Sequence, residues 1–213
     1  MTPKTIQLKR RAAKKRRQVT LWGLVIGAVA VLVGAYLFFA PDLLSKSAQT
    51  RYEAGQPGAG DLAPEFSLLA VGGETFSLAN YRGQKNVLLF FQEGVGCDLC
   101  WQQSQELQAK RDFLSQRDVE VAIIAIDPLF NLEPVALEYG LTLPVLSDSD
   151  KSVSRLYDML GFGMHPGFRP AHSFVLIGKD GTILWRADYG APPRQAMYVP
   201  EQEIYDAVAV ALR

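Results

Sequence analysis

The chain has 213 residues with 22 basic and 22 acidic side chains, so its formal net charge is zero. This average hides a split, because residues 1–20 hold eight Lys or Arg and no acid, whereas the remainder has 14 bases against 22 acids. An acidic remainder would repel phosphate, so we expect no nucleic-acid partner. About 150 residues remain once the N-terminal part is set aside, which suits one domain with a single core.

Residues 21–40 form an apolar stretch without a charged side chain. About 20 helical residues cross a hydrocarbon core roughly 30 Å thick, so the stretch predicts a transmembrane helix. The basic tail at residues 1–20 would stay in the cytoplasm, which places the rest of the chain outside. A cleaved signal peptide is the alternative, but the stretch is longer than a signal peptide needs and ends in a poor cleavage site before Pro41. We therefore expect a single-pass signal anchor in the cell membrane.

Residues 41–60 are small and polar, contain Gly and Pro, and show no sustained apolar period, so they predict a linker. The folded domain is expected to cover residues 61–213. Its first elements are two short strands at residues 66–70 and 74–78. A Gly-Gly pair lies between them, which is typical of a β-hairpin.

Residues 86–91 are almost wholly apolar, as in a strand buried on both faces. A helical period follows over residues 97–116. Further strands are predicted at 119–126, 144–146, 173–177 and 182–187, and further helices at 132–139, 151–160 and 200–212. This alternation predicts an α/β fold with a central mixed sheet flanked by helices.

The only two cysteines, Cys97 and Cys100, follow a predicted buried strand and open a predicted helix. Unpaired backbone N–H groups and the helix dipole stabilise a thiolate there, so the thiol pKa falls below its usual value of roughly 8.5. Cys97 is therefore the predicted nucleophile, and Cys100, one turn later, the resolving thiol. A disulfide that closes so short a loop adds little stability, which argues against a purely structural role.

The sequence lacks the residue patterns of a zinc site and of a phosphate-binding loop. Zinc needs two further ligands, and the spacing of His165 and His172 matches no familiar structural site. Gly94 and Gly96 lack the neighbours of a phosphate loop and are interpreted as points of close backbone approach. We expect neither a bound metal nor a dissolved cofactor, and we interpret the remaining acids, including Glu93, as solvated surface groups.

Several motifs occur together in the domain: APEFSL at 63–68, FSL at 76–78 with YRG at 81–83, VLLFF at 87–91, the cysteine pair, LPVLSD at 143–148, and FVLI at 174–177 with DG at 180–181. Over most of residues 61–213 they resemble the redoxin, AhpC/TSA-like group of the thioredoxin superfamily, which includes membrane-tethered oxidoreductases and peroxiredoxins. The resemblance implies a thioredoxin-like fold with an N-terminal β-hairpin extension. It also implies thiol exchange or peroxide reduction as the chemistry.

The chain departs from both branches of this group near the cysteines. Peroxiredoxins place a Pro and a Thr or Ser before their peroxidatic cysteine, whereas QEGVG precedes Cys97. The thioredoxin branch carries a cis-proline before the strand at 174–177, where His172 stands here. His172 is thus either a polar partner of the Cys97 thiolate or a loop histidine. Arg169 is a candidate for the arginine that peroxiredoxins place near the sulfur.

Two residues beside the cysteines complete the candidate site. The negative charge of Asp98 opposes a thiolate but favours the start of a helix, and we hypothesise that it makes the pair more reducing. Trp101 either covers the site or belongs to the core.

These observations predict a membrane-anchored thiol–disulfide oxidoreductase. Its partners would be thiol or disulfide proteins, an electron donor or acceptor, and the lipid bilayer through residues 21–40. The alternative is a peroxiredoxin-like antioxidant peroxidase, in which peroxide oxidises Cys97 to a sulfenic acid and Cys100 condenses with it. A further alternative is a copper chaperone of the Sco type, since two thiolates and His172 suit copper, although that type has three residues between its cysteines and this chain has two.

Overall fold

The computed structural model describes residues 27, 29, 31 and 52–213. The predicted basic tail and linker up to residue 51 lie outside the described residues, and so does the predicted transmembrane helix at 21–40 apart from three positions that are helical. No helix among the described residues is both long and apolar enough to cross a membrane. Gln49–Arg213 forms one compact unit.

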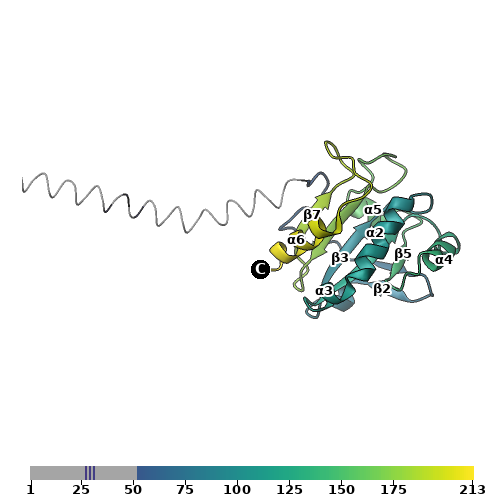
Figure 1. Ribbon diagram of the computed structural model, residues 1–213, viewed down its shortest axis with the longest axis horizontal. Helices are drawn as coiled ribbons and strands as arrows, with labels where there is room; N and C mark the ends of the chain where they lie inside the picture. Colours follow the sequence, from purple (N-terminus) through teal and green to yellow (C-terminus); the bar gives the residue numbers. More distant parts are fainter. Residues whose placement is uncertain (1–26, 28, 30, 32–51) are drawn as a thin grey trace, which may run out of the picture. The chain divides into compact units, whose positions relative to one another are not determined.

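A five-stranded mixed sheet lies at the centre of this unit, in the order β5-β4-β3-β6-β7 (Figure 1). Strands β3, β4 and β5 are parallel, whereas β6 is antiparallel to β3 and β7 to β6. Every residue of β3 is buried, because the central strand is covered on both faces. The strands are β3 (Asn86–Phe91), β4 (Val119–Ala125), β5 (Val145–Ser147), β6 (Ser173–Ile177) and β7 (Ile183–Asp188).

Four helices contribute to the core on one face of the sheet, the face toward which Leu88 and Phe90 of β3 point. They are α2 (Asp98–Ala109), α3 (Arg111–Ser115), α4 (Leu129–Glu138) and α6 (Glu201–Ala211). Helices α2 and α3 replace the single helix predicted over residues 97–116, because the chain leaves helical geometry at Lys110. Figure 1 shows α2 lying across the sheet, so the helix that starts at the cysteines packs directly on β3.

The opposite face is covered by the predicted hairpin and by a short helix. Strands β1 (Ser67–Leu69) and β2 (Thr75–Ser77) pair antiparallel, which confirms the hairpin, and a 3-10 helix, η1 (Leu78–Tyr81), follows it. Helix α5 (Ser152–Leu156) is shorter than the predicted helix over 151–160. Val87, Leu89 and Phe91 of β3 pack toward this side, so the strand's alternate residues belong to two separate cores.

Residues 52–60, which the sequence analysis assigned to the linker, are hydrogen-bonded to β7. The carboxylate of Asp188 accepts from the N–H groups of Ala54 at 2.7 Å and Gly55 at 3.0 Å. Arg186, fully buried, pairs with Asp188 at 2.9 Å. The folded unit therefore includes residues that precede Asp61.

Candidate active site

The two cysteines lie at the start of α2 and are joined by a disulfide, with 5.3 Å between their Cα atoms. Cys97 occupies the N-cap position, and its carbonyl accepts from the N–H groups of Cys100 at 3.0 Å and Trp101 at 3.3 Å. The two are unequally accessible, because Cys97 is half-buried and Cys100 has no exposed surface. A partner can therefore reach the Cys97 side chain, while that of Cys100 faces the interior.

Two predicted neighbours take different positions around the disulfide. Asp98 is exposed in the first turn of α2, where its charge favours the positive end of the helix dipole. Trp101 is only 1% exposed and packs in the core, with its ring centroid 6.2 Å from that of Tyr139. Of the two interpretations of Trp101, the structure supports the core residue.

Residues 92–96 connect β3 to the cysteines through two glycines with positive φ, +86° at Gly94 and +96° at Gly96. The Val95 N–H donates to Oδ2 of Asp127 at 2.9 Å. A Cβ on Gly94 would lie 1.8 Å from the same oxygen, so only glycine allows this approach. The close approach predicted at the glycines is present at Gly94, and its partner is the carboxylate of Asp127.

Glu93 is 6% exposed, so its interpretation as a solvated surface group is wrong. Its Oε2 lies 3.0 Å from Nδ1 of His165, whereas Oε1 is buried without a hydrogen-bond partner among the described residues. Nη1 of Arg169 donates to the Glu93 carbonyl and lies 3.4 Å from Oδ2 of Asp127. His165 and Arg169, in the segment before β6, therefore both contact Glu93 in the loop that leads to Cys97.

His172 directly precedes β6 and is completely buried. Its ring lies edge-on to Phe90 and Phe174, with centroid distances of 4.7 and 5.6 Å. Both ring nitrogens, like both side-chain polar atoms of buried Gln92, lack a hydrogen-bond partner among the described residues. Burial, reinforced by the charge of Arg194, lowers the pKa of His172 from 6.5 to about 3, so its imidazole is neutral at physiological pH.

His172 and Gln92 lie at the same end of the sheet. Phe91 pairs with Ser173, so the next position along this antiparallel register brings Gln92 beside His172, at the end of β3 that leads to the cysteines. The described cis peptide bonds precede Pro57 and Pro193, so no cis-proline precedes β6 at this position.

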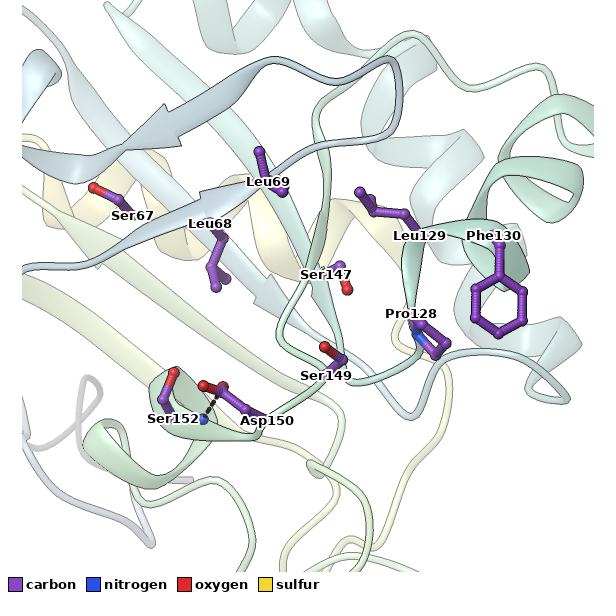
Figure 2. A pocket seen from close by; sticks show the side chains of 10 residues that line it. All are labelled: Ser67, Leu68, Leu69, Pro128, Leu129, Phe130, Ser147, Ser149, Asp150 and Ser152. Carbon is purple, nitrogen blue, oxygen red and sulfur yellow. Dashed lines mark hydrogen bonds between the residues drawn. The ribbon is translucent and has the colours of Figure 1, made fainter.

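A cavity of about 620 Å³ is lined by neither cysteine. Figure 2 shows that its wall comes from three separate segments: β1, the start of α4 at Pro128, and the end of β5 with the chain that follows it. Ser147 in this wall donates its hydroxyl to the carbonyl of Asp127 at 2.8 Å. The cavity thus borders the segment that supports the redox loop.

The described residues contain no group of three or more His, Cys, Asp or Glu side chains arranged to hold a metal ion.

A comparison of the sequence with known protein families agrees with this structure, in which a cysteine pair lies at a helix N-terminus beside a mixed sheet. The sequence profile of the AhpC/TSA family matches residues 59–186. The chain belongs to the AhpC/TSA family. The resemblance inferred from the sequence motifs is therefore confirmed.

The curated relatives of this AhpC/TSA chain include two kinds of oxidoreductase. It is 29% identical over 125 residues to the thiol-disulfide oxidoreductase ResA of Geobacillus thermodenitrificans, a match that covers 58% of this chain and 66% of that protein, slightly under two thirds. It is 33% identical over 128 residues to the peroxiredoxin Bcp of Escherichia coli K12, which covers 59% of this chain and 81% of Bcp. Both kinds are oxidoreductase enzymes.

Solved structures support the thioredoxin-like fold of the AhpC/TSA chain. The AhpC of Mycobacterium bovis superposes with a TM-score of 0.63 at 15% identity, covering 74% of this chain and 98% of that one. The reduced 2-Cys peroxiredoxin of Plasmodium vivax gives a TM-score of 0.60 at 23% identity, over 72% of this chain and 81% of that one. At these identities the likeness concerns the fold alone.

Sequence reasoning placed the cysteines at the start of a helix, but it missed the contact of Asp127 with the loop before that helix and the burial of Gln92 and Glu93 in the loop. One signal was visible for Gln92 and Glu93, because they are the first polar residues after the apolar run at 87–91 that leads to Cys97. Asp127 likewise ends an apolar run. Its proximity to the loop depends on parallel pairing of β3 with β4, which the sequence alone did not establish.

Proposed function

We propose that this protein is a membrane-anchored thiol–disulfide oxidoreductase that works through Cys97 and Cys100. The observation that carries the proposal is the disulfide at the start of α2, with one half-buried and one fully buried cysteine. Helix N-terminal N–H groups stabilise the thiolate at the accessible position. The ResA relative supports this activity, and its name describes the same chemistry.

The proposed exchange has two steps. The reduced Cys97 thiolate attacks one sulfur of a partner disulfide, forms a mixed disulfide and releases the first partner thiolate. Cys100 then loses its proton and attacks the Cys97 sulfur, which releases the second partner thiolate and closes Cys97–Cys100. The partner gains two electrons and the enzyme loses two, so a thiol reductant must restore the dithiol. The same steps in reverse oxidise a partner dithiol.

The location of the enzyme is part of the proposal. Residues 21–40 have the length and composition of a membrane span, and residues 1–20 carry only basic charges. The redox domain would lie outside the cytoplasm, where disulfides persist, and its partners would be thiol or disulfide proteins. Labelling of cysteines engineered at both ends of the span, with a membrane-impermeant maleimide on intact cells, tests this orientation.

The decisive experiment is reduction of a model disulfide peptide by the reduced full-length chain. We expect wild type to reduce the peptide and Cys97→Ser to be inactive. Cys100→Ser should accumulate a mixed disulfide with the peptide, because the resolving thiol is missing. Trapping by Cys97→Ser instead of Cys100→Ser would reverse the assigned roles, and an inactive wild type would contradict the proposal.

Peroxide reduction is a second candidate, favoured by 33% identity to peroxiredoxin Bcp. In this reaction peroxide oxygen is transferred to the Cys97 thiolate, and Cys100 displaces water from the sulfenic acid to form the same disulfide. The five residues before Cys97 contain neither the proline nor the hydroxyl of a peroxiredoxin pocket. Peroxide consumption faster than peptide reduction would favour this candidate over thiol exchange.

A further inference from the structure

The loop that delivers Cys97 is held by a side chain from the next strand connection. Asp127 follows β4, and its Oδ2 accepts the N–H of Val95, two residues before the nucleophile, at 2.9 Å. The Asp127 side chain is 12% exposed, so water competes little for this hydrogen bond. The loop before Cys97 is therefore hydrogen-bonded, through Asp127, to the connection that follows β4.

The backbone of the loop is shaped to admit this carboxylate. Gly94 is buried with φ +86°, and a Cβ at this position would lie 1.8 Å from Oδ2 of Asp127. The Cys97 N–H in turn donates to the Gly94 carbonyl at 3.2 Å, which closes a turn directly onto the nucleophile. Asp127 therefore contacts Gly94 and Val95 directly, and one backbone hydrogen bond links Gly94 to Cys97.

A second attachment comes from the segment before β6. Arg169 donates through Nη1 to the Glu93 carbonyl and lies 3.4 Å from Asp127 Oδ2, so one guanidinium joins the loop to its anchor. Its side chain is 32% exposed. Arg169 thus acts on the backbone of the loop in this structure.

We propose that Asp127, assisted by Arg169, is a positioning residue that keeps Cys97 at the N-terminus of α2. This inference rests on the proposed function only in giving Cys97 the role of nucleophile. The hydrogen bond to Val95 holds the turn that places the Cys97 sulfur where the first-turn N–H groups stabilise a thiolate. Loss of that hydrogen bond loosens the turn and reduces the thiolate fraction.

Charge and position predict opposite results at Asp127, which makes the proposal testable. A carboxylate near a thiolate disfavours it, so removal of the charge alone would lower the thiol pKa and speed the reaction of Cys97. Removal of the hydrogen bond loosens the loop and slows the reaction. Asp127→Ala removes both, whereas Asp127→Asn removes the charge and keeps a carbonyl oxygen for the Val95 N–H.

The experiment measures the rate at which iodoacetamide alkylates Cys97, as a function of pH, in the full-length chain carrying Cys100→Ser. Since helix N-terminal stabilisation corresponds to a factor of about two to five, we expect Asp127→Ala to slow alkylation by about that factor at pH 7 and to raise the midpoint of the pH profile. Asp127→Asn should restore the rate to the wild-type value or above. Asp150→Ala, which removes an exposed carboxylate that accepts from the Ser152 N–H, is the matched control and should leave the rate unchanged.

Equal or faster alkylation in Asp127→Ala would overturn the proposal and leave charge as the only effect. If Asp127→Ala fails to fold, Arg169→Lys replaces it, because lysine keeps the charge but its ammonium lies one bond nearer the backbone than Nη1, the atom that contacts both Glu93 and Asp127. It should also slow alkylation relative to its control Arg155→Lys, and an unchanged rate would overturn the proposal. Alkylation needs no partner disulfide, so its result stands apart from wild-type peptide reduction, whose absence would refute the proposed function instead.

Discussion

The buried histidine before β6 should make the stability of this protein depend on pH. His172 has no exposed surface, and burial lowers the pKa of its imidazole from 6.5 to about 3. In the unfolded chain the group takes up a proton near its ordinary pKa, whereas in the folded chain it stays neutral. Between these two pKa values the unfolded state binds more protons, so the free energy of unfolding falls as the pH falls.

The magnitude follows from the two pKa values. The stability that depends on the neutral imidazole is fully present above pH 6.5. It is lost progressively as the pH falls from the unfolded pKa of 6.5 to the folded pKa of about 3. With these values, the free energy of unfolding should decrease by about 2 kcal/mol between pH 8 and pH 5, and by about 3 kcal/mol between pH 8 and pH 4. For a protein with ordinary marginal stability this is a large share of the total.

The perturbation is His172→Leu, which replaces the imidazole by an apolar side chain among Phe90 and Phe174. At pH 8 we expect its stability to equal or exceed that of wild type, because neither imidazole nitrogen has a hydrogen-bond partner to lose among the described residues. At pH 5 the variant should be more stable than wild type by about 2 kcal/mol beyond any difference at pH 8. Urea unfolding of the oxidised full-length chain, followed by tryptophan fluorescence, measures both differences.

The control is Val175→Ala, a truncation of a buried side chain that carries no titrating group, in β6, the strand that follows His172. It should lower stability by the same amount at every pH, because the loss is apolar. The carboxylates common to all three chains titrate alike and cancel in the comparison. The reasoning would be refuted if the free energies of unfolding of wild type and His172→Leu changed in parallel between pH 8 and pH 5. The imidazole would then take up its proton in the folded state too.

Three further substitutions test the packing around the sheet by urea unfolding at pH 7. Arg186→Gln should cost roughly 3 to 5 kcal/mol, because it leaves the buried carboxylate of Asp188 without its cation, and a loss below 1 kcal/mol would show that the pair is solvated. Tyr157→Phe should cost about 1 kcal/mol, since its hydroxyl donates to the Pro64 carbonyl at 2.8 Å, and a stabilised variant would contradict that bond. Gln103→Ala should cost about 1 to 3 kcal/mol, because its amide oxygen is the acceptor for a buried backbone N–H before α6; unchanged stability would mean that water replaces it.

The sequence by itself determined the main strands of the sheet and the position of the cysteine pair at the start of a helix. The apolar run at residues 86–91 is β3, and the polar, periodic segment after Cys97 starts as α2. Both follow from local causes, since burial on two faces selects a wholly apolar strand and a 3.6-residue period selects a helix. The cysteine pair at their junction needed only sequence spacing, because residues three apart lie on adjacent turns of a helix. The membrane span derived from the sequence stays a prediction.

Only the tertiary structure decided which polar groups surround that pair. Val95 and Asp127 are 32 residues apart and Glu93 and Arg169 are 76 apart, so no local pattern relates them. Glu93 is charged and therefore predicted to be solvated, yet the chain before β6 covers it. The physical reason is that periodicity reports which face of an element is buried, whereas the partners on that face depend on strand order and on the paths of loops. In this protein the parallel pairing of β3 with β4 brings Asp127 to the cysteine loop.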